Sequence, residues 1–121
     1  MMRCGFIPAF LLGLAAPMVA LAGTPSVSEC LEASDFIANA AQSRDNGVSR
    51  DAFMQRLNGD FALIHDFPAS LRWFAHDESD ERFLARAAAD VFDAPAPPET
   101  HRTQFLSACF ARVQQGDSPS V

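Results

Sequence analysis

The chain has 121 residues, a length that suits one small domain, and 49% of them are hydrophobic. It carries 9 basic against 15 acidic side chains, a formal net charge of −6, and it contains no lysine. An acidic chain without a basic cluster is a poor partner for nucleic acid or an anionic membrane, and we expect neither.

The first 22 residues have the pattern of a secretory signal peptide. Arg3 gives the positive start, residues 6–14 are apolar, and Ala20-Leu21-Ala22 is a small-x-small cleavage site. Because the apolar run is short and interrupted by proline, we expect no permanent membrane span. Cleavage near Ala22 would remove Arg3, change the formal charge from −6 to −7, and leave a periplasmic or secreted protein.

The remainder is expected to form a single all-α domain over residues 23–116, followed by a disordered tail over residues 117–121. No segment alternates apolar and polar residues as a strand does, whereas apolar residues recur with helical spacing. We therefore expect a small bundle of four to five helices. In chain order, the expected helical segments run from 26 or 28 to 45, over 49–58 and 60–65, from 66 or 67 onward, from 77 or 79 to 93, and over 97–115.

The first segment carries clear signals for both of its ends. Ser26 and Glu29 fit a capping box, and Gly47 supplies a left-handed stop. Phe36 lies almost opposite the apolar stripe, so it either packs under a neighbouring loop or helix or is exposed for contact with a partner. The stripe itself consists of Val27, Cys30, Leu31, Ser34, Ile37, Ala38 and Ala41.

The second segment is short. Ser49 is placed to cap it, and the helical spacing turns Phe53, Met54 and Leu57 inward. The dipeptide Asn58-Gly59 is a stop signal, so we expect this helix to end there and a separate helical stretch to begin at Asp60.

Aromatic residues are then concentrated at Phe61, Phe67, Trp73 and Phe74. Most of them must belong to the core. However, Trp73 and Phe74 are adjacent and cannot both point in one direction from a helix. One of them is expected at the surface, where large aromatic side chains anchor protein interfaces. Phe36 and Trp73 are therefore the residues that we expect to contact a partner.

The last two segments have matching apolar faces. A connector rich in proline joins them at residues 94–98, and Pro97 or Pro98 opens the final helix. Matching faces and a short connector predict an antiparallel pair. The two stripes consist of Phe83, Leu84, Ala87, Ala88, Val91 and Phe92, and of Phe105, Leu106, Cys109, Phe110 and Val113.

Cys30 and Cys109 both fall on the buried stripes of their helices, one near each end of the mature chain. In an oxidising compartment such a pair is expected to form a disulfide, which would join the first helix to the last. Closing a loop of about 80 residues stabilises a fold by about 4.5 kcal/mol on the chain-entropy estimate. A buried bond of this kind is expected to be inert in redox chemistry.

His76 precedes an acidic run made of Asp77, Glu78, Asp80 and Glu81. Several carboxylates could bind a hard cation, but the run lacks the glycine turn and the ligand order of a calcium loop. Acidic residues also cap helices and favour the positive end of the helix dipole. We expect this second role and no metal site.

The remaining residues give no catalytic pattern. His65, His76 and His101 are not three or four residues apart, so no helix offers a zinc-binding pair, and His101 is expected to be exposed. The serines are caps or tail residues, no Gly-x-Ser-x-Gly occurs, and the cysteines are expected to be oxidised. We therefore predict no catalytic residue, no metal and no cofactor.

Several features together resemble a set of short secreted proteins of proteobacteria. They are an early cysteine on a helix, Ile37-Ala38, the helix end Arg44-Asp45-Asn46-Gly47, an alanine-rich helix ending in Val91-Phe92 before prolines, and a last helix with Phe105 and Cys109. That set is all-helical with two cysteines and no established activity. The resemblance therefore implies a fold and a compartment only.

Three functions remain open. The first is a binding or interaction protein, such as an inhibitor or an accessory subunit, with an unidentified protein partner in the cell envelope; half-exposed Phe36 and Trp73 would support it. The second is a chaperone for acid or envelope stress, in which protonation of carboxylates loosens the fold. The third is a small hydrolase that uses a pair of carboxylates, which would need a pocket with convergent polar groups.

Overall fold

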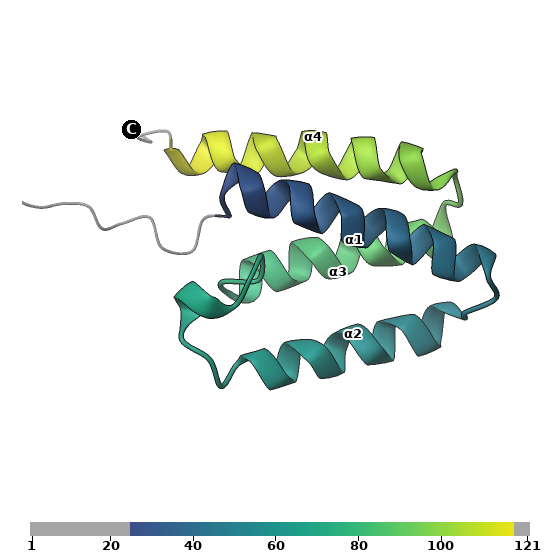
Figure 1. Ribbon diagram of the computed structural model, residues 1–121, viewed down its shortest axis with the longest axis horizontal. Helices are drawn as coiled ribbons and strands as arrows, with labels where there is room; N and C mark the ends of the chain where they lie inside the picture. The colour runs from purple at the N-terminus through teal and green to yellow at the C-terminus, as the bar shows by residue number, and fades with distance from the viewer. Residues whose placement is uncertain (1–24, 118–121) are drawn as a thin grey trace, which may run out of the picture.

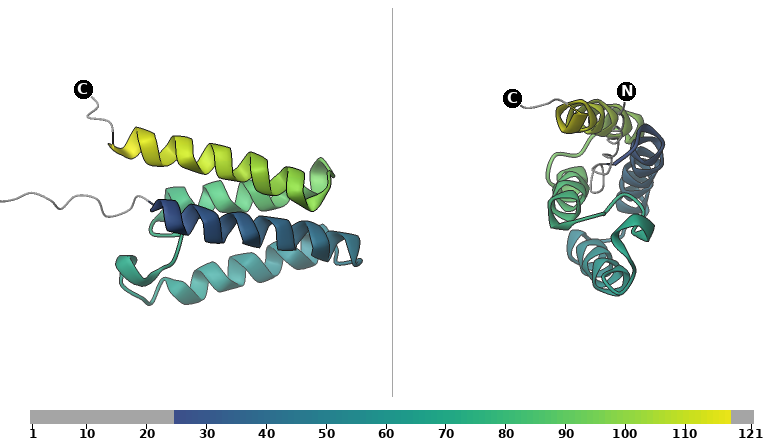
Figure 2. Two further views of the ribbon diagram at one scale, coloured as in Figure 1. Left: turned by 45° about the horizontal axis from the view of Figure 1, so that its top comes forward. Right: turned by 90° about the vertical axis from the view of Figure 1, so that its left-hand side faces the viewer.

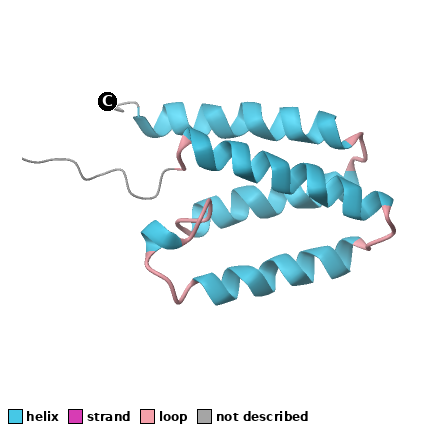
Figure 3. Ribbon diagram, viewed as in Figure 1, coloured by secondary structure: helices cyan, strands magenta, loops and turns pink. Residues whose placement is uncertain are grey.

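The computed structural model describes residues 25–117 (Figure 1). The predicted signal peptide, residues 1–22, and residues 118–121 of the predicted tail lie outside this part. Each helix runs antiparallel to the next, and the described residues contain no strand, so the predicted all-α bundle is confirmed (Figure 3). The elements are α1 (Val27–Asp45), α2 (Arg50–Ile64), the 3₁₀ turn η3 (Ala69–Leu71), α3 (Glu78–Asp93) and α4 (Pro98–Asp117).

Both predicted ends of α1 are present. The Ser26 hydroxyl accepts a hydrogen bond from the Glu29 amide at 3.1 Å, and the Glu29 carboxylate accepts one from the Ser26 amide at 3.0 Å. After the helix, Gly47 adopts φ of 101°, a left-handed conformation that favours glycine. These local signals need no tertiary contact, which is why the sequence alone reveals them.

The bundle is organised around α1, which packs against both α4 and α3 (Figure 2). Its buried face is made mainly of small side chains, so neighbouring helices can approach closely. The sequence predicts α3 and α4 as the directly packed pair, but the closest neighbour of α4 is α1. The fully buried residues of α1 are Cys30, Ala33, Ser34, Ile37, Ala38, Ala40 and Ala41.

The apolar stripe predicted for α1 is wrong at one edge. Val27 and Leu31 are exposed, while Ala33 and Ala40 are buried. On a helical wheel the buried face is centred near Cys30, and Leu31 lies about 100° from it. Alanine carries little weight in an apolar pattern, so the alanine side of this face could not be recognised.

The predicted break at Asn58-Gly59 is wrong, because α2 continues through it to Ile64. The Ser49 cap is confirmed, since its hydroxyl accepts a hydrogen bond from the Ala52 amide at 3.1 Å. A glycine within a helix costs about 1 kcal/mol relative to alanine. Here Leu57 and Phe61, one turn apart, are both buried in the core, and their burial outweighs that cost.

The helix predicted from residue 66 or 67 is absent. It is replaced by the single turn η3 and a loop in which Trp73 has φ of 57°. The Arg72 guanidinium holds this loop by donating to the carbonyl oxygens of Phe67 and His65, at 2.8 and 3.1 Å. These contacts satisfy loop carbonyl oxygens that a helix would otherwise pair. The spacing of apolar residues in the sequence does not reveal them.

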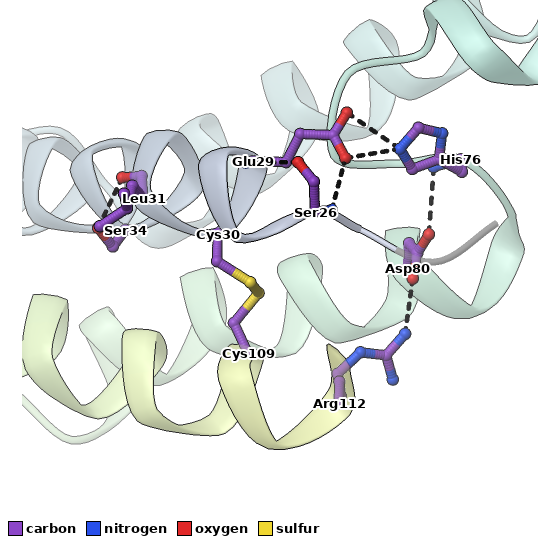
Figure 4. The surroundings of a disulfide bond; sticks show 9 residues. All are labelled: Ser26, Glu29, Cys30, Leu31, Ser34, His76, Asp80, Cys109 and Arg112. Atoms are coloured by element: carbon purple, nitrogen blue, oxygen red, sulfur yellow. Dashed lines mark hydrogen bonds and ion pairs between the residues drawn. A yellow bond between two sulfur atoms is a disulfide. The ribbon is translucent and has the colours of Figure 1, made fainter. Parts of the chain in front are cut away.

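The predicted disulfide is confirmed. Cys30 of α1 and Cys109 of α4 are bonded, with 5.8 Å between their Cα atoms, and neither is accessible to solvent (Figure 4). The bond lies within the packed face between the two helices. Among residues 25–117, no helix combines the length and the apolar character that crossing a membrane requires.

Candidate functional site

The two aromatic residues predicted to contact a partner lie against each other at the surface. The rings of Phe36 and Trp73 meet edge to face, with centroids 6.0 Å apart. Trp73 is 36% exposed and Phe36 is partly buried, whereas Phe74, next in the chain, is fully buried. One of the two adjacent aromatic residues is therefore at the surface, as expected, although their rings still contact each other, with centroids 6.1 Å apart.

Trp73 is held in place by two contacts with α1. Its indole Nε1 donates a hydrogen bond to the Glu32 carboxylate at 3.0 Å, and its ring packs on Phe36. A bulky residue at positive φ is strained and persists only where its surroundings impose that conformation. The indole is therefore presented in one orientation and not left free to rotate.

A groove of about 360 Å³ opens between α1 and α2 beside this pair. Phe36 forms one side, and its ring lies 5.8 Å from that of Phe53. We call this the α1–α2 groove. It is lined by Phe36, Ser43, Val48, Ala52, Phe53, Arg56, Leu57 and Asp60.

Charged groups at the edge of the α1–α2 groove are free to act on a ligand. Arg56 and Asp60 both line it, and neither makes an ion pair within the described part of the chain. Glu32, which receives the Trp73 hydrogen bond, also has no cationic partner there. The aromatic site thus has more acidic than basic side chains around it.

Further apolar side chains are exposed near the end of α2 and at η3. Leu63, Leu71 and Phe67 are 69%, 68% and 51% exposed. This end of the bundle also contains the start of α1 (Figure 1). Sequence periodicity missed these residues as surface features, because it placed Phe67 and Leu71 on a buried helix that does not form.

The acidic run at the start of α3 has a structural role. Asp77 caps the helix by accepting a hydrogen bond from the Asp80 amide at 2.9 Å. Asp80 is fully buried and lies 2.6 Å from Arg112 of α4 (Figure 4). Burial raises the pKa of Asp80, against the opposing effect of the Arg112 hydrogen bond. Residues 25–117 contain no cluster of three or more groups suited to a metal ion.

Two histidines pair with acidic residues from other elements. His76 lies 2.8 Å from Glu29 at the start of α1, and its other ring nitrogen contacts the Ala69 carbonyl at 2.9 Å (Figure 4). His65 contacts Glu81 at 2.5 Å. Sequence spacing did not predict either pair, since the partners lie far apart in the chain.

His101 was expected to be exposed, and this is wrong: only 6% of it is accessible. Burial lowers its pKa, and the nearby positive charge of Arg44 lowers it further. The sequence did contain an indication of this burial, because His101, Phe105 and Cys109 follow one another at intervals of four residues and share a helix face. All three are buried.

No protein-family model, no curated protein and no solved structure matches the chain.

Proposed function

We propose that this is a periplasmic or secreted binding protein that receives an apolar segment of a protein partner in the α1–α2 groove. The observation that carries the proposal is the contact between Phe36 and Trp73 at the surface. Neither ring is fully buried, and Phe36, on which Trp73 packs, lines the groove. Large aromatic residues beside a pocket are the usual anchors of protein interfaces.

The fixed orientation of Trp73 favours binding. The Glu32 hydrogen bond and the Phe36 contact already restrict the indole, so a partner loses little further conformational freedom on docking. Val48 and partly buried Phe53 add apolar surface within the groove. An amphipathic helix that places large apolar residues on one face fits a groove between two helices.

Charge favours a basic partner. Asp60 and Glu32 have no cationic partner in residues 25–117, and the whole chain has a formal charge of −6. A partner helix with arginine or lysine beside its apolar face would complement both carboxylates. The Cys30–Cys109 disulfide supports an oxidising compartment for this encounter.

The test selects peptides from a random library on the purified protein and then measures their affinity by titration calorimetry. We expect the selected sequences to combine spaced apolar residues with basic ones. Val48→Glu and Trp73→Ala should each weaken binding about tenfold or more, since each alters the groove or its anchor. Leu71→Glu is the matched control, because Leu71 is apolar and exposed but does not line the groove.

The proposal is wrong if peptides bind the Val48→Glu and Leu71→Glu variants equally well. It is also wrong if the selected sequences lack either the apolar or the basic component. Circular dichroism and the midpoint of unfolding of each variant establish that a loss of binding does not arise from loss of the fold.

The chaperone for acid or envelope stress is the second candidate, and the exposure of Leu63 and Leu71 favours it. These side chains offer apolar surface to a partly unfolded client. The test measures aggregation of a client protein at pH 3 and pH 7, with the Leu63→Glu/Leu71→Glu double variant as comparison. Near-UV dichroism that persists at pH 3, without dye binding or suppression of aggregation, would count against this function.

A further inference from the structure

Two adjoining cavities of about 200 and 210 Å³ lie along α3 and α4, and the side chains of Phe83 and Arg86 line both of them. We call the two cavities together the α3–α4 cleft. The first extends to buried Ile37 of α1, the helix that both α3 and α4 pack around (Figure 2). The polar residues that line the α3–α4 cleft as a whole are Ser79, Arg82, Arg86, Asp90, His101, Gln104 and Arg112.

The cleft contains the unpaired polar atoms of the buried interior. Within the described residues, two buried side-chain atoms have no hydrogen-bond partner, Nε2 of His101 and Nε of Arg112. Each residue lines one of the two cavities. Buried polar atoms in native proteins are nearly always paired, so these two atoms mark the cleft as a place where a small molecule, water included, would complete the hydrogen bonding.

Three arginines meet in this cleft although the protein as a whole is acidic. Arg112 lies 2.6 Å from buried Asp80, with its guanidinium over the ring of Phe83 at 4.6 Å from the centroid. Arg82 is 3.5 Å from Glu78 in an exposed pair. Arg86 makes no ion pair in residues 25–117, so its positive charge is available to a ligand.

We propose that the α3–α4 cleft binds a small organic carboxylate with an apolar body. The carboxylate would lie between Arg86 and Arg112, since a guanidinium matches a carboxylate with two parallel hydrogen bonds. The apolar body would pack on Phe83 and Phe105, and His101 would pair with a polar group of the ligand. This site is separate from the α1–α2 groove and does not depend on the function proposed above.

The experiment is an NMR titration of the purified protein with 4-phenylbutanoate and with octanoate. We expect saturable shifts of the Nε–Hε signals of Arg86 and Arg112 and of the His101 ring. Neutral 4-phenylbutanol and inorganic phosphate test whether both the charge and the apolar body are needed. Arg86→Gln should weaken binding of the acids about tenfold, the value of one charge-assisted hydrogen-bonded contact.

Arg56→Gln is the matched control. Arg56 is the other arginine that forms neither an ion pair nor a side-chain hydrogen bond in the described chain, and it lines the α1–α2 groove. Affinity for the acids should be unchanged in this variant. The proposal is overturned if neither acid gives saturable shifts, if phenylbutanol or phosphate binds as tightly as the acids, or if Arg86→Gln binds them as well as Arg56→Gln.

Discussion

The guanidinium of Arg112 in α4 lies 2.6 Å from the carboxylate of Asp80 in α3, and the Asp80 side chain is almost completely buried. Asp80 also accepts a hydrogen bond from the His76 amide at 3.3 Å, so one carboxylate connects α4, α3 and the preceding loop. Removing the arginine would leave a buried carboxylate without its counterion. We expect Arg112→Met to lower the free energy of unfolding by about 3 kcal/mol.

The pH dependence of the Arg112→Met variant tests whether its loss of stability comes from the unpaired Asp80 carboxylate. Burial raises the pKa of Asp80, so its protonated form is favoured in the folded protein, and loss of Arg112 removes an opposing effect. Stability of Arg112→Met should therefore rise as pH falls through the raised pKa. The Asp80→Asn/Arg112→Met double variant is the control for urea unfolding. A single variant as stable as the wild type, or with an unchanged pH profile, would contradict the prediction.

The disulfide is expected to stabilise the fold without taking part in chemistry. Cys30 and Cys109 have a sequence separation of 79, and both are inaccessible to solvent. Replacing both by alanine should lower the free energy of unfolding by about 4.5 kcal/mol, the value expected for closing a loop of this length. Urea unfolding of the double variant and of reduced wild type should agree. An unchanged melting temperature would show that the bond does not clamp α1 to α4.

Features that depend on a few adjacent residues could be predicted from the sequence. The capping box of Ser26 and Glu29, the left-handed Gly47 and the Asp77 cap are all present. The disulfide could be predicted because each cysteine falls within a row of apolar residues that recur with the spacing of one helix face. A surface position for one of the adjacent residues Trp73 and Phe74 was also expected and is found, although the helix on which that expectation rested does not form.

Features that depend on tertiary packing could not be predicted. A glycine was expected to end α2, but burial of Leu57 and Phe61 on either side of Gly59 outweighs its low helix propensity. The arginines of the α3–α4 cleft are up to 30 residues apart in sequence, from Arg82 to Arg112, and no linear pattern shows that they converge. No linear pattern shows that the residues of the α1–α2 groove converge, either.

The positive φ of Trp73 predicts an unusual effect of glycine. A side chain in the left-handed region costs about 1–2 kcal/mol, and glycine does not incur this cost. Trp73→Gly should therefore be more stable than Trp73→Ala by about 1 kcal/mol, although both lose the contacts with Glu32 and Phe36. Ala69→Gly, at negative φ in η3, is the control and should destabilise. Equal stability of the two Trp73 variants would indicate that the loop relaxes when the indole is removed.

His76 should make the protein more stable at slightly acidic pH. Burial lowers its pKa, but the hydrogen bonds to Glu29 and the Ala69 carbonyl and the charges of Glu29 and Asp80 raise it above its ordinary value. The resulting stabilisation is fully present below about pH 6.5 and is lost as pH rises through the raised pKa. His76→Gln should differ most from wild type near pH 5.5 in urea unfolding. A difference that does not decline by pH 8 would exclude this ionisation as its source.

His101 should have the opposite effect. Burial, together with the charge of Arg44, lowers its pKa despite the opposing charge of Asp90, so the folded protein favours the neutral ring. Its contribution is fully present above about pH 6.5 and is lost as pH falls through the lowered pKa, because the unfolded chain binds the proton more readily. His101→Gln should therefore lose less stability than wild type between pH 7 and pH 5, whereas His76→Gln should lose more. Parallel urea-unfolding profiles for His101→Gln and wild type across this range would show that His101 does not ionise differently in the two states.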